Sequence, residues 1–250
     1  MEEALFRLYA DLPRQGPGSD AVTLDIMRRL PPLPTGARVL DLGCGSGRQT
    51  LVLARELGVP VIAVDLYREF LDRLERAAAE QGLADRIQVR EADMAAPGEP
   101  DGSVDLIWSE GAAYNLGFGA ALAAWRRLLK PGGLAVISEC TWLTDDPPEE
   151  PAAFWHAAYP GMGTVAANVA MARDRGYEVL ETMVLPATAW WENYYDPLRR
   201  RMAELQPEAA DDAELAALLA ETATEIALFE RWSAVYGYVF YVLRALGETP

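Results

Sequence analysis

Residues 39–47 read Val-Leu-Asp-Leu-Gly-Cys-Gly-Ser-Gly, and this stretch decides the fold. An apolar run ending at Asp41 is typical of a buried strand, and three glycines follow at alternate positions. Glycine has no Cβ, so such a turn can adopt positive φ and let a ligand approach the backbone closely. A helical pattern begins near Thr50, and we expect its N-terminus to offer free N–H groups. The stretch therefore predicts a small-molecule site at the carboxyl end of a parallel strand.

Strand and helix patterns alternate around this turn. After helices within 4–30, interrupted at 14–19, the expected strands cover 38–42, 60–64, 87–91, 104–109 and 134–139, with helices over 49–57, 67–81 and 120–129. Strands separated by crossover helices imply a parallel sheet with both faces covered. The second half is less regular, with a helix over 164–175, a strand over 177–185, a largely helical insert over 186–233 and a last strand over 236–243. A length of 250 residues fits one α/β domain.

The charge of the chain argues against several classes of partner. The formal net charge is -16, Lys130 is the only lysine, and the arginines are scattered. Nucleic-acid binding relies on clustered basic side chains, so we expect no nucleic-acid partner and no anionic membrane partner. No apolar run approaches the length of a membrane span. The acidic N-terminus also lacks the pattern of a signal peptide.

Cysteine and histidine usage favours a reduced protein without a metal. Cys44 and Cys140 are far apart in sequence and suggest neither a disulfide framework nor a metal site, so a cytoplasmic location is expected. His156 is the only histidine, which excludes multi-histidine metal chemistry and disfavours a Ser-His-Asp triad. It is interpreted as a surface or packing residue, with the alternative of a base acting near neutral pH.

The spacing of the glycines separates three classes of nucleotide-binding turn. A P-loop ends in Gly-Lys-Ser/Thr, whereas this chain has Gly47-Arg48-Gln49. A dehydrogenase turn has Gly-x-Gly-x-x-Gly spacing, whereas Gly43, Gly45 and Gly47 alternate. Asp41 followed by these glycines resembles the first motif of the class I S-adenosylmethionine-dependent methyltransferases. The resemblance implies a Rossmann-like seven-stranded sheet in the order 3-2-1-4-5-7-6, with strand 7 antiparallel, helices on both faces and a helical lid.

The resemblance also implies an activity. The cofactor would be S-adenosyl-L-methionine, and the product S-adenosyl-L-homocysteine. The reaction would be direct in-line transfer of the methyl group to an N, O or S nucleophile of a small molecule. Since the sulfonium is already a good leaving group, the enzyme mainly needs to align the reactants and exclude water. Methylation of a protein or RNA, or binding of the cofactor without catalysis, remain the alternatives.

Acidic residues at the ends of the second and third strands fit this family. The resemblance assigns the ribose hydroxyls to Asp65, the adenine ring to Leu66 and Met94, and the adenine amino group to Asp93. The alternative for Asp65 is a helix N-cap, and for Asp93 an ordinary loop cap. The complete cofactor-binding set that we expect is Gln15, Gly16, Gly18, Ser19, Asp41, Gly43, Cys44, Gly45, Gln49, Thr50, Asp65, Leu66, Asp93, Met94 and Ser109.

The end of the fourth strand should lie beside the methyl acceptor. In an open parallel sheet this end faces the site, and here the chain reads Trp108-Ser109-Glu110 and continues to Asn115. Glu110 is the first candidate for a catalytic residue that orients the acceptor or takes a proton, and Tyr114 and Asn115 are further candidates. The alternative is that Ser109 and Glu110 cap and brace the loop.

Three segments resemble a narrower bacterial group of methyltransferases whose substrate is unassigned. That group shares Arg14–Ser19, Trp108–Asn115 and the Tyr-Gly-Tyr-Val-Phe-Tyr ending at 236–241. We expect Gln15–Ser19 to close over the cofactor; the alternative is a plain Gly-Pro turn.

The inserts carry the remaining expectations. They hold five of the seven tryptophans, with Glu192 among them, which predicts an aromatic acceptor pocket that could take a cationic amine through cation–π contact. The alternative is that these rings pack the insert onto the sheet. We expect one domain over 1–250 with lid elements at 1–30, 143–163 and 186–233, and a monomer or homodimer. The aromatic residues concerned are Trp142, Trp155, Trp190, Trp191, Trp232, Phe154, Tyr159, Tyr194 and Tyr195.

Overall fold

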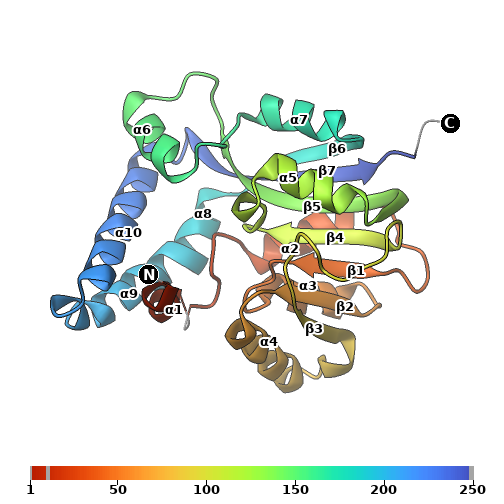
Figure 1. Cartoon of the computed structure of the whole chain (residues 1–250), viewed down its shortest axis with the longest axis horizontal. Coiled ribbons are helices and arrows are strands. Elements are labelled where there is room, and N and C mark those ends of the chain that lie inside the picture. Colours follow the sequence, from red (N-terminus) through yellow and green to blue (C-terminus); the bar gives the residue numbers. More distant parts are fainter. Residues whose placement is uncertain (1, 10–11, 248–250) are drawn as a thin grey trace.

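A computed structural model describes residues 2–9 and 12–247 of the chain. Within them, seven strands form one sheet in the order β3-β2-β1-β4-β5-β7-β6, with β7 antiparallel to both of its neighbours (Figure 1). The expected strand order and the antiparallel last strand are confirmed. The strands are β1 (Val39–Leu42), β2 (Val61–Asp65), β3 (Ile87–Glu91), β4 (Val104–Glu110), β5 (Leu129–Trp142), β6 (Tyr177–Val184) and β7 (Tyr236–Ala245).

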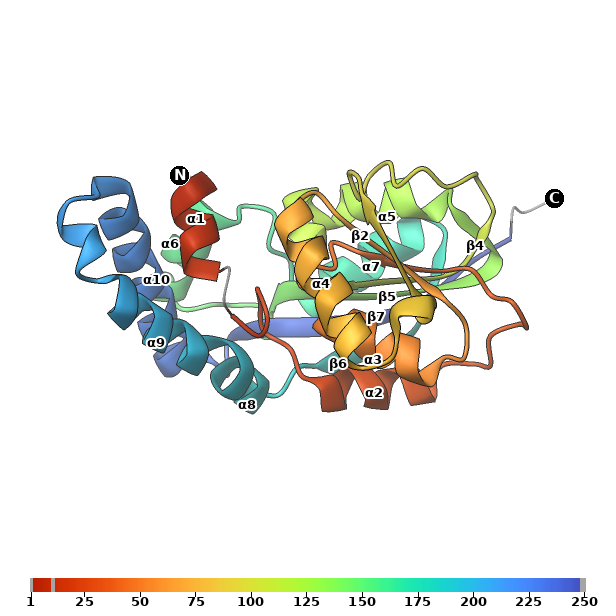
Figure 2. The ribbon, with the colours of Figure 1, turned by 90° about the horizontal axis from the view of Figure 1, so that it is seen from below.

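Helices cover both faces of this sheet. Figure 2 shows α2 (Asp20–Arg29) and α3 (Arg48–Glu56) on one side, and α5 (Phe118–Arg126) and α7 (Val165–Asp174) on the other. Successive strand residues point to opposite faces, so Val39 packs with Leu53 of α3 while Leu40 packs with Leu122 of α5. Burial on both faces explains why the inner strands are continuous apolar runs. The crossover helix α4 (Arg68–Glu80) connects β2 to β3.

A second group of helices lies beyond the carboxyl ends of the strands (Figure 1). The first helix of the chain contacts two helices of the late insert, and Arg7 forms ion pairs there with Glu208 and Asp212. In contrast, α2 falls inside the expected lid segment 1–30 but packs against α3 on the sheet. The group contains α1 (Glu2–Tyr9), α6 (Glu149–Ala158), α8 (Ala187–Trp190), the π-helical turn η3 (Trp191–Tyr195), α9 (Asp196–Leu205), the 3₁₀ turn η4 (Glu208–Ala210) and α10 (Ala213–Trp232). The 3₁₀ turns η1 (Ala84–Arg86) and η2 (Ala113–Asn115) lie elsewhere.

The main departures from the expected elements concern β5 and α6. β5 begins at Leu129, which pairs with Val104 ahead of a register shift, rather than at Leu134. It continues to Trp142 because β7 pairs with it along nine residues. The acidic stretch near 149–158, to which no helix was assigned, forms α6. Among the described residues, no helix is both long and apolar enough to span a membrane.

Candidate functional site

The glycine turn after β1 needs its glycines for both conformation and space. Gly43, Gly45 and Gly47 have φ values of 70°, 54° and 78°, a region that disfavours any residue with a Cβ. A Cβ on Gly43 would lie 2.3 Å from the Cβ of Ala112, in the loop after β4. One on Gly47 would lie 2.3 Å from Leu74 Cδ1. The turn is therefore held tightly between β4 and α4.

The backbone N–H groups of residues 43–47 donate hydrogen bonds to acceptors within the protein. Those of Gly43 and Cys44 go to the carbonyl oxygen of Val64, and that of Gly47 goes to Cys44. The Gly45 N–H goes to a carboxylate oxygen of Asp65, and the Ser46 N–H to the side-chain oxygen of Gln15. These five amides thus do not form the phosphate-binding nest of a P-loop. The turn itself offers a ligand close backbone approach and a neighbouring carboxylate.

Asp65 is the carboxylate that the turn presents to the cavity. Its Oδ2 accepts the N–H of Gly45 at 2.8 Å, and its Oδ1 accepts the N–H of Tyr67 at 3.1 Å. Burial raises the pKa of Asp65, and the two backbone N–H groups oppose that change. A carboxylate has about four acceptor sites, so each oxygen retains one for a ligand hydroxyl. The N-cap of α4 is Tyr67, so the N-cap alternative for Asp65 is wrong, and the remaining acceptor sites of Asp65 are compatible with a ligand role.

Asp41 lies behind the turn and braces it. It is fully buried, and its Oδ2 accepts the hydroxyl of Thr50 at 2.5 Å. Gln49 donates to Asp41 Oδ1 at 3.4 Å and to the Cys44 carbonyl at 3.1 Å. Burial raises the pKa of Asp41 to about 7. These contacts join the start of α3 to the end of β1, so Asp41 and Thr50 support the site from outside its lining.

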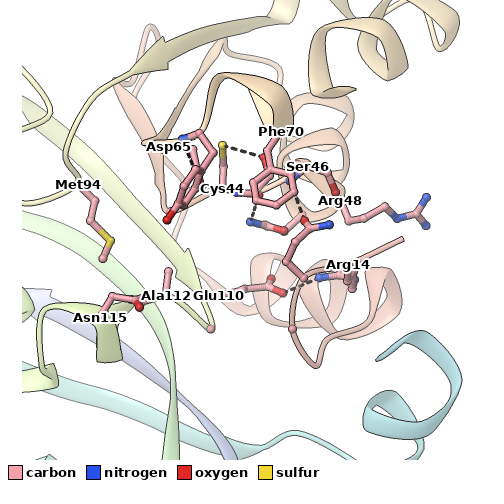
Figure 3. Close-up of a pocket in the computed structure, with 18 of the residues that line it drawn as sticks. Arg14, Cys44, Ser46, Arg48, Asp65, Phe70, Met94, Glu110, Ala112 and Asn115 are labelled. Carbon is pink, nitrogen blue, oxygen red and sulfur yellow. Dashed lines mark hydrogen bonds and ion pairs between the residues drawn. The ribbon is translucent and has the colours of Figure 1, made fainter. Parts of the chain in front are cut away.

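The first cavity, of about 270 Å³, opens between the turn, the loops after β2 to β4, and the N-terminal segment (Figure 3). The expected residues on its wall are Gln15, Gly16, Gly43, Cys44, Gly45, Gln49, Asp65, Leu66, Met94, Glu110, Tyr114 and Asn115. Those that lie outside the wall are Gly18, Ser19, Asp41, Thr50, Asp93 and Ser109.

The last two of these residues have other partners. Asp93 is exposed and accepts the N–H of Ala95 at 2.8 Å, as in its loop-cap interpretation. Ser109 is fully buried and donates to the carbonyl oxygen of Leu42 at 2.8 Å. Its hydroxyl thereby ties β4 to β1 beneath the turn.

The segment between α1 and α2 is bonded directly to the glycine turn and to β4. Gln15 accepts the N–H of Ser46 at 2.9 Å and donates to the carbonyls of Tyr9 and Leu12 at 3.3 Å. Arg14 is buried and reaches Glu110 at 3.1 Å and Asp20 at 2.9 Å. Figure 3 shows Arg14 and Glu110 pointing toward one another. The segment is therefore more than a plain Gly-Pro turn, since its side chains form part of the cavity wall.

Both carboxylate oxygens of Glu110 are engaged by the protein. Oε1 accepts the Thr23 hydroxyl at 2.6 Å and the Trp108 indole N–H at 2.9 Å, while Oε2 faces Arg14. The side chain is 3% exposed. Because three donors bind this buried carboxylate, Glu110 holds α2, β4 and the N-terminal segment together. The bracing interpretation of Glu110 thus has direct geometric support, which the catalytic interpretation lacks.

A second cavity of about 440 Å³ adjoins the first and extends toward the lid helices. The two cavities share a wall made of residues 15–17, Tyr67, Phe70, Gly111, Tyr114 and Asn115. Aromatic residues make up more than half of the second lining. The rings are those of Phe6, Tyr9, Tyr67, Phe70, Tyr114, Trp155, Tyr159, Trp190, Tyr194 and Tyr238.

The aromatic residues of the inserts divide between this cavity and the core. Trp155 and Trp190 line the cavity, whereas Trp142 packs edge-on against Tyr236. Trp232 lies outside the lining and donates its indole N–H to Glu150 at 2.9 Å. Glu192, the acidic residue singled out in the sequence, is exposed and is not a lining residue. His156 is also exposed, and its Nδ1 lies 2.7 Å from the carbonyl oxygen of Ala152, as a surface interpretation expects.

Several lining residues were missed from the sequence. The most informative is Glu225, which reaches the second cavity from α10. It lies three residues after Thr222 and four before Phe229, both buried, so it belongs to the inward, largely apolar face of α10. That pattern was available in the sequence. The first cavity adds residues that lie within the quoted motifs, namely Arg14, Pro17, Ser46, Gly47, Gly111 and Ala112, and residues outside any motif, namely Arg48, Tyr67, Phe70 and Ala92.

Comparison with known proteins identifies a methyltransferase domain in the part of the chain that contains the glycine turn. A family model described as a methyltransferase domain matches residues 39–133. The uncharacterized protein YjhP of Escherichia coli K12 is 32% identical over 202 residues, which are 79% of this chain and 79% of YjhP. The dimethylglycine N-methyltransferase of Parasynechococcus marenigrum is 37% identical over 122 residues. That match spans 48% of this chain and 44% of the length of that enzyme.

Solved structures share the fold along nearly the whole chain. The crystal structure of YjhP has a TM-score of 0.80 at 25% identity, covering 97% of this chain and 99% of that one. A methyltransferase from Geobacter sulfurreducens, solved in complex with S-adenosyl-L-homocysteine, has a TM-score of 0.81 at 23% identity and covers 98% of both chains. The lid helices are therefore part of a recurring architecture.

Proposed function

We propose that this chain, which belongs to the class I S-adenosylmethionine-dependent methyltransferases, methylates a small organic molecule held in the second cavity. The observation that carries the proposal is the wall shared by the two cavities, which includes residues 15–17, Gly111, Tyr114 and Asn115. One cavity has the features of a nucleoside site, and the other, of about 440 Å³, has the size and apolar lining of a small-molecule site.

The residues of the first cavity fit S-adenosylmethionine. Asp65 would accept the two ribose hydroxyls with its free acceptor sites, in charge-assisted hydrogen bonds. Leu66 and Met94 would lie against the adenine ring, since both line the cavity beyond Asp65. Asp93 would need to turn from the Ala95 N–H to reach the adenine amino group. When bound, the cofactor supplies an electrophilic methyl group on a sulfonium whose thioether is a good leaving group.

The protein's own contribution is alignment and the exclusion of water. Tyr114 and Asn115 line both cavities, so we propose that they contact the acceptor where it meets the cofactor. Gln15 joins the N-terminal segment to the glycine turn and so closes one side of the shared wall. Holding two reactants in line contributes several kcal/mol to such a reaction, on the order of 7–11 in the best cases. We propose Glu110 as a positioning residue, because its oxygens are taken by three donors.

The dimensions and charge of the chain favour a small acceptor over a macromolecule. The second cavity is bounded by lid residues from α1, α6, α8 and α10, so an acceptor must fit between them. The net charge of -16 also disfavours RNA and DNA. The cyanobacterial relative named as a dimethylglycine N-methyltransferase supports a small acceptor by analogy.

The test is a screen of small amines, thiols, phenols and carboxylates for release of S-adenosyl-L-homocysteine. We expect turnover with a subset of one chemical class and none with tRNA or unfolded protein. Asp65→Ala is the matched control, because it should lose cofactor binding while the second cavity stays intact. Turnover with a macromolecule and with none of the small molecules would contradict the proposal.

A further inference from the structure

We propose that the second cavity selects a methyl acceptor that carries a positively charged nitrogen, which Glu225 holds among the aromatic rings of the lid. This inference rests on the proposed function and names the substrate class. The atom that receives the methyl group would lie at the shared wall near Tyr114, and the cationic group would lie deeper, toward α10.

The lining of the second cavity is acidic. Among the described residues that line the second cavity, Glu225 is the only one with a charged side chain. No arginine or lysine in residues 2–9 and 12–247 is an ion-pair partner of Glu225, and its charged neighbour is another acid, Glu221. Its one hydrogen-bond donor is the Tyr195 hydroxyl, at 2.7 Å. Burial raises the pKa of Glu225, and a cation bound in the cavity would favour its charged form.

Aromatic rings line the second cavity together with Glu225. Tyr9 and Tyr194 lie within hydroxyl contact at 3.4 Å, and Trp190 packs edge-on against Tyr238 with centroids 4.9 Å apart. All four of these rings line the cavity together with Glu225. Aromatic faces attract cations, most strongly where water is excluded. An anionic acceptor would meet Glu225 and these electron-rich faces without any basic side chain to offset the repulsion.

One arginine of the late insert already lies against an aromatic ring. Arg199 lies 4.9 Å from the ring of Trp191, but neither residue lines the cavity. This arginine is instead paired with Glu230 at 3.2 Å. In the described part of the chain, no cation–π contact involves a ring of the second cavity, and Glu225, unlike the exposed Glu192, lines that cavity.

The experiment uses three probes of matched size and different charge. 2-Phenylethylamine is cationic at pH 7, 2-phenylethanol is neutral and 3-phenylpropionate is anionic. Their dissociation constants are measured by calorimetry on the full chain saturated with S-adenosyl-L-homocysteine, which presents no sulfonium charge to repel the amine. We expect the amine to bind about tenfold to a hundredfold more tightly than the alcohol, as charge-assisted hydrogen bonds allow, and the acid to bind most weakly.

Two variants test whether Glu225 causes the preference for the amine over the alcohol. Glu225→Gln keeps an acceptor for the Tyr195 hydroxyl but removes the charge, so the amine should lose its advantage while the affinity for the alcohol changes less than about twofold. Glu221→Gln, one helical turn away and exposed, should retain the full preference. Equal binding of amine and alcohol by the unmodified chain would overturn the inference without any variant. In that case, intact binding of S-adenosyl-L-homocysteine and turnover of a neutral acceptor would leave the proposed function standing.

Discussion

Replacing Glu110 by glutamine tests whether this carboxylate anchors the site or catalyses the reaction. In Glu110→Gln, one carbonyl oxygen remains for the Thr23 and Trp108 donors, while the new amide N–H₂ faces the Arg14 guanidinium. Removing one partner of a buried ion pair costs about 3–5 kcal/mol. Because Arg14 keeps its second partner, Asp20, at 2.9 Å, we expect the lower end, about 3 kcal/mol.

The assay is equilibrium unfolding in urea, with the thermal midpoint as a second measure. For a chain of this length, a loss of about 3 kcal/mol lowers the midpoint by roughly 6–12 °C. Thr23→Val is the matched control, since it removes one neutral donor to the same carboxylate and should cost only about 1–2 kcal/mol. We also expect weaker binding of S-adenosyl-L-homocysteine in Glu110→Gln, because Arg14 and Gln15 lie on one segment of the cavity wall.

A different result would refute this reasoning. If Glu110→Gln kept the stability and the S-adenosyl-L-homocysteine affinity of the unmodified chain but lost turnover about a thousandfold, Glu110 would act as a base. That magnitude is typical of removing a general base. The anchoring role would then be wrong.

Two further variants probe the turn and the sheet. Gly43→Ala should cost about 2–4 kcal/mol, because its Cβ would meet Ala112 and its φ is 70°, whereas Gly132→Ala, with φ of 78° and no atom within 4 Å, should cost only about 1 kcal/mol in urea unfolding. Similar costs for the two would contradict the close packing. Burial raises the pKa of Glu139 to about 8. As the pH rises from about 4.5 to 8, the unfolded chain loses this proton first, so the stability contribution of Glu139 falls. Glu139→Gln should therefore gain stability relative to the unmodified chain between pH 5.5 and 8, and a constant difference would contradict the raised pKa.

The sheet was predictable because its signals are local. The apolar run at 61–64 and the glycine turn at 43–47 are each contained in a few residues, and the family resemblance supplied the strand order. The start of β5 at Leu129 was not predictable, since pairing with Val104 across the sheet overrides a local Pro-Gly-Gly turn signal.

A site residue was predictable only where its position at the end of a strand determines which way its side chain points. Asp65 is the last residue of β2 and presents its carboxylate to the cavity, as expected for a residue at the end of a parallel strand. Glu110 ends β4 in the same way, but two of its partners, Arg14 and Thr23, are 96 and 87 residues away in the sequence. The second cavity combines α1, the loop after β4, α6 and α10, and no local pattern specifies which of their rings face inward.

The most direct measurement is a calorimetric titration of S-adenosyl-L-homocysteine into the full chain, into Asp65→Asn and into Asp101→Asn. Asp101 is an exposed acid paired with Arg127 and lies outside the first cavity. We predict one-to-one binding by the unmodified chain and by Asp101→Asn, and a loss of about tenfold to a hundredfold in Asp65→Asn, since two charge-assisted bonds to the ribose would be weakened. Absence of binding by the unmodified chain, or equal binding by Asp65→Asn, would contradict the assignment of this cavity to the cofactor.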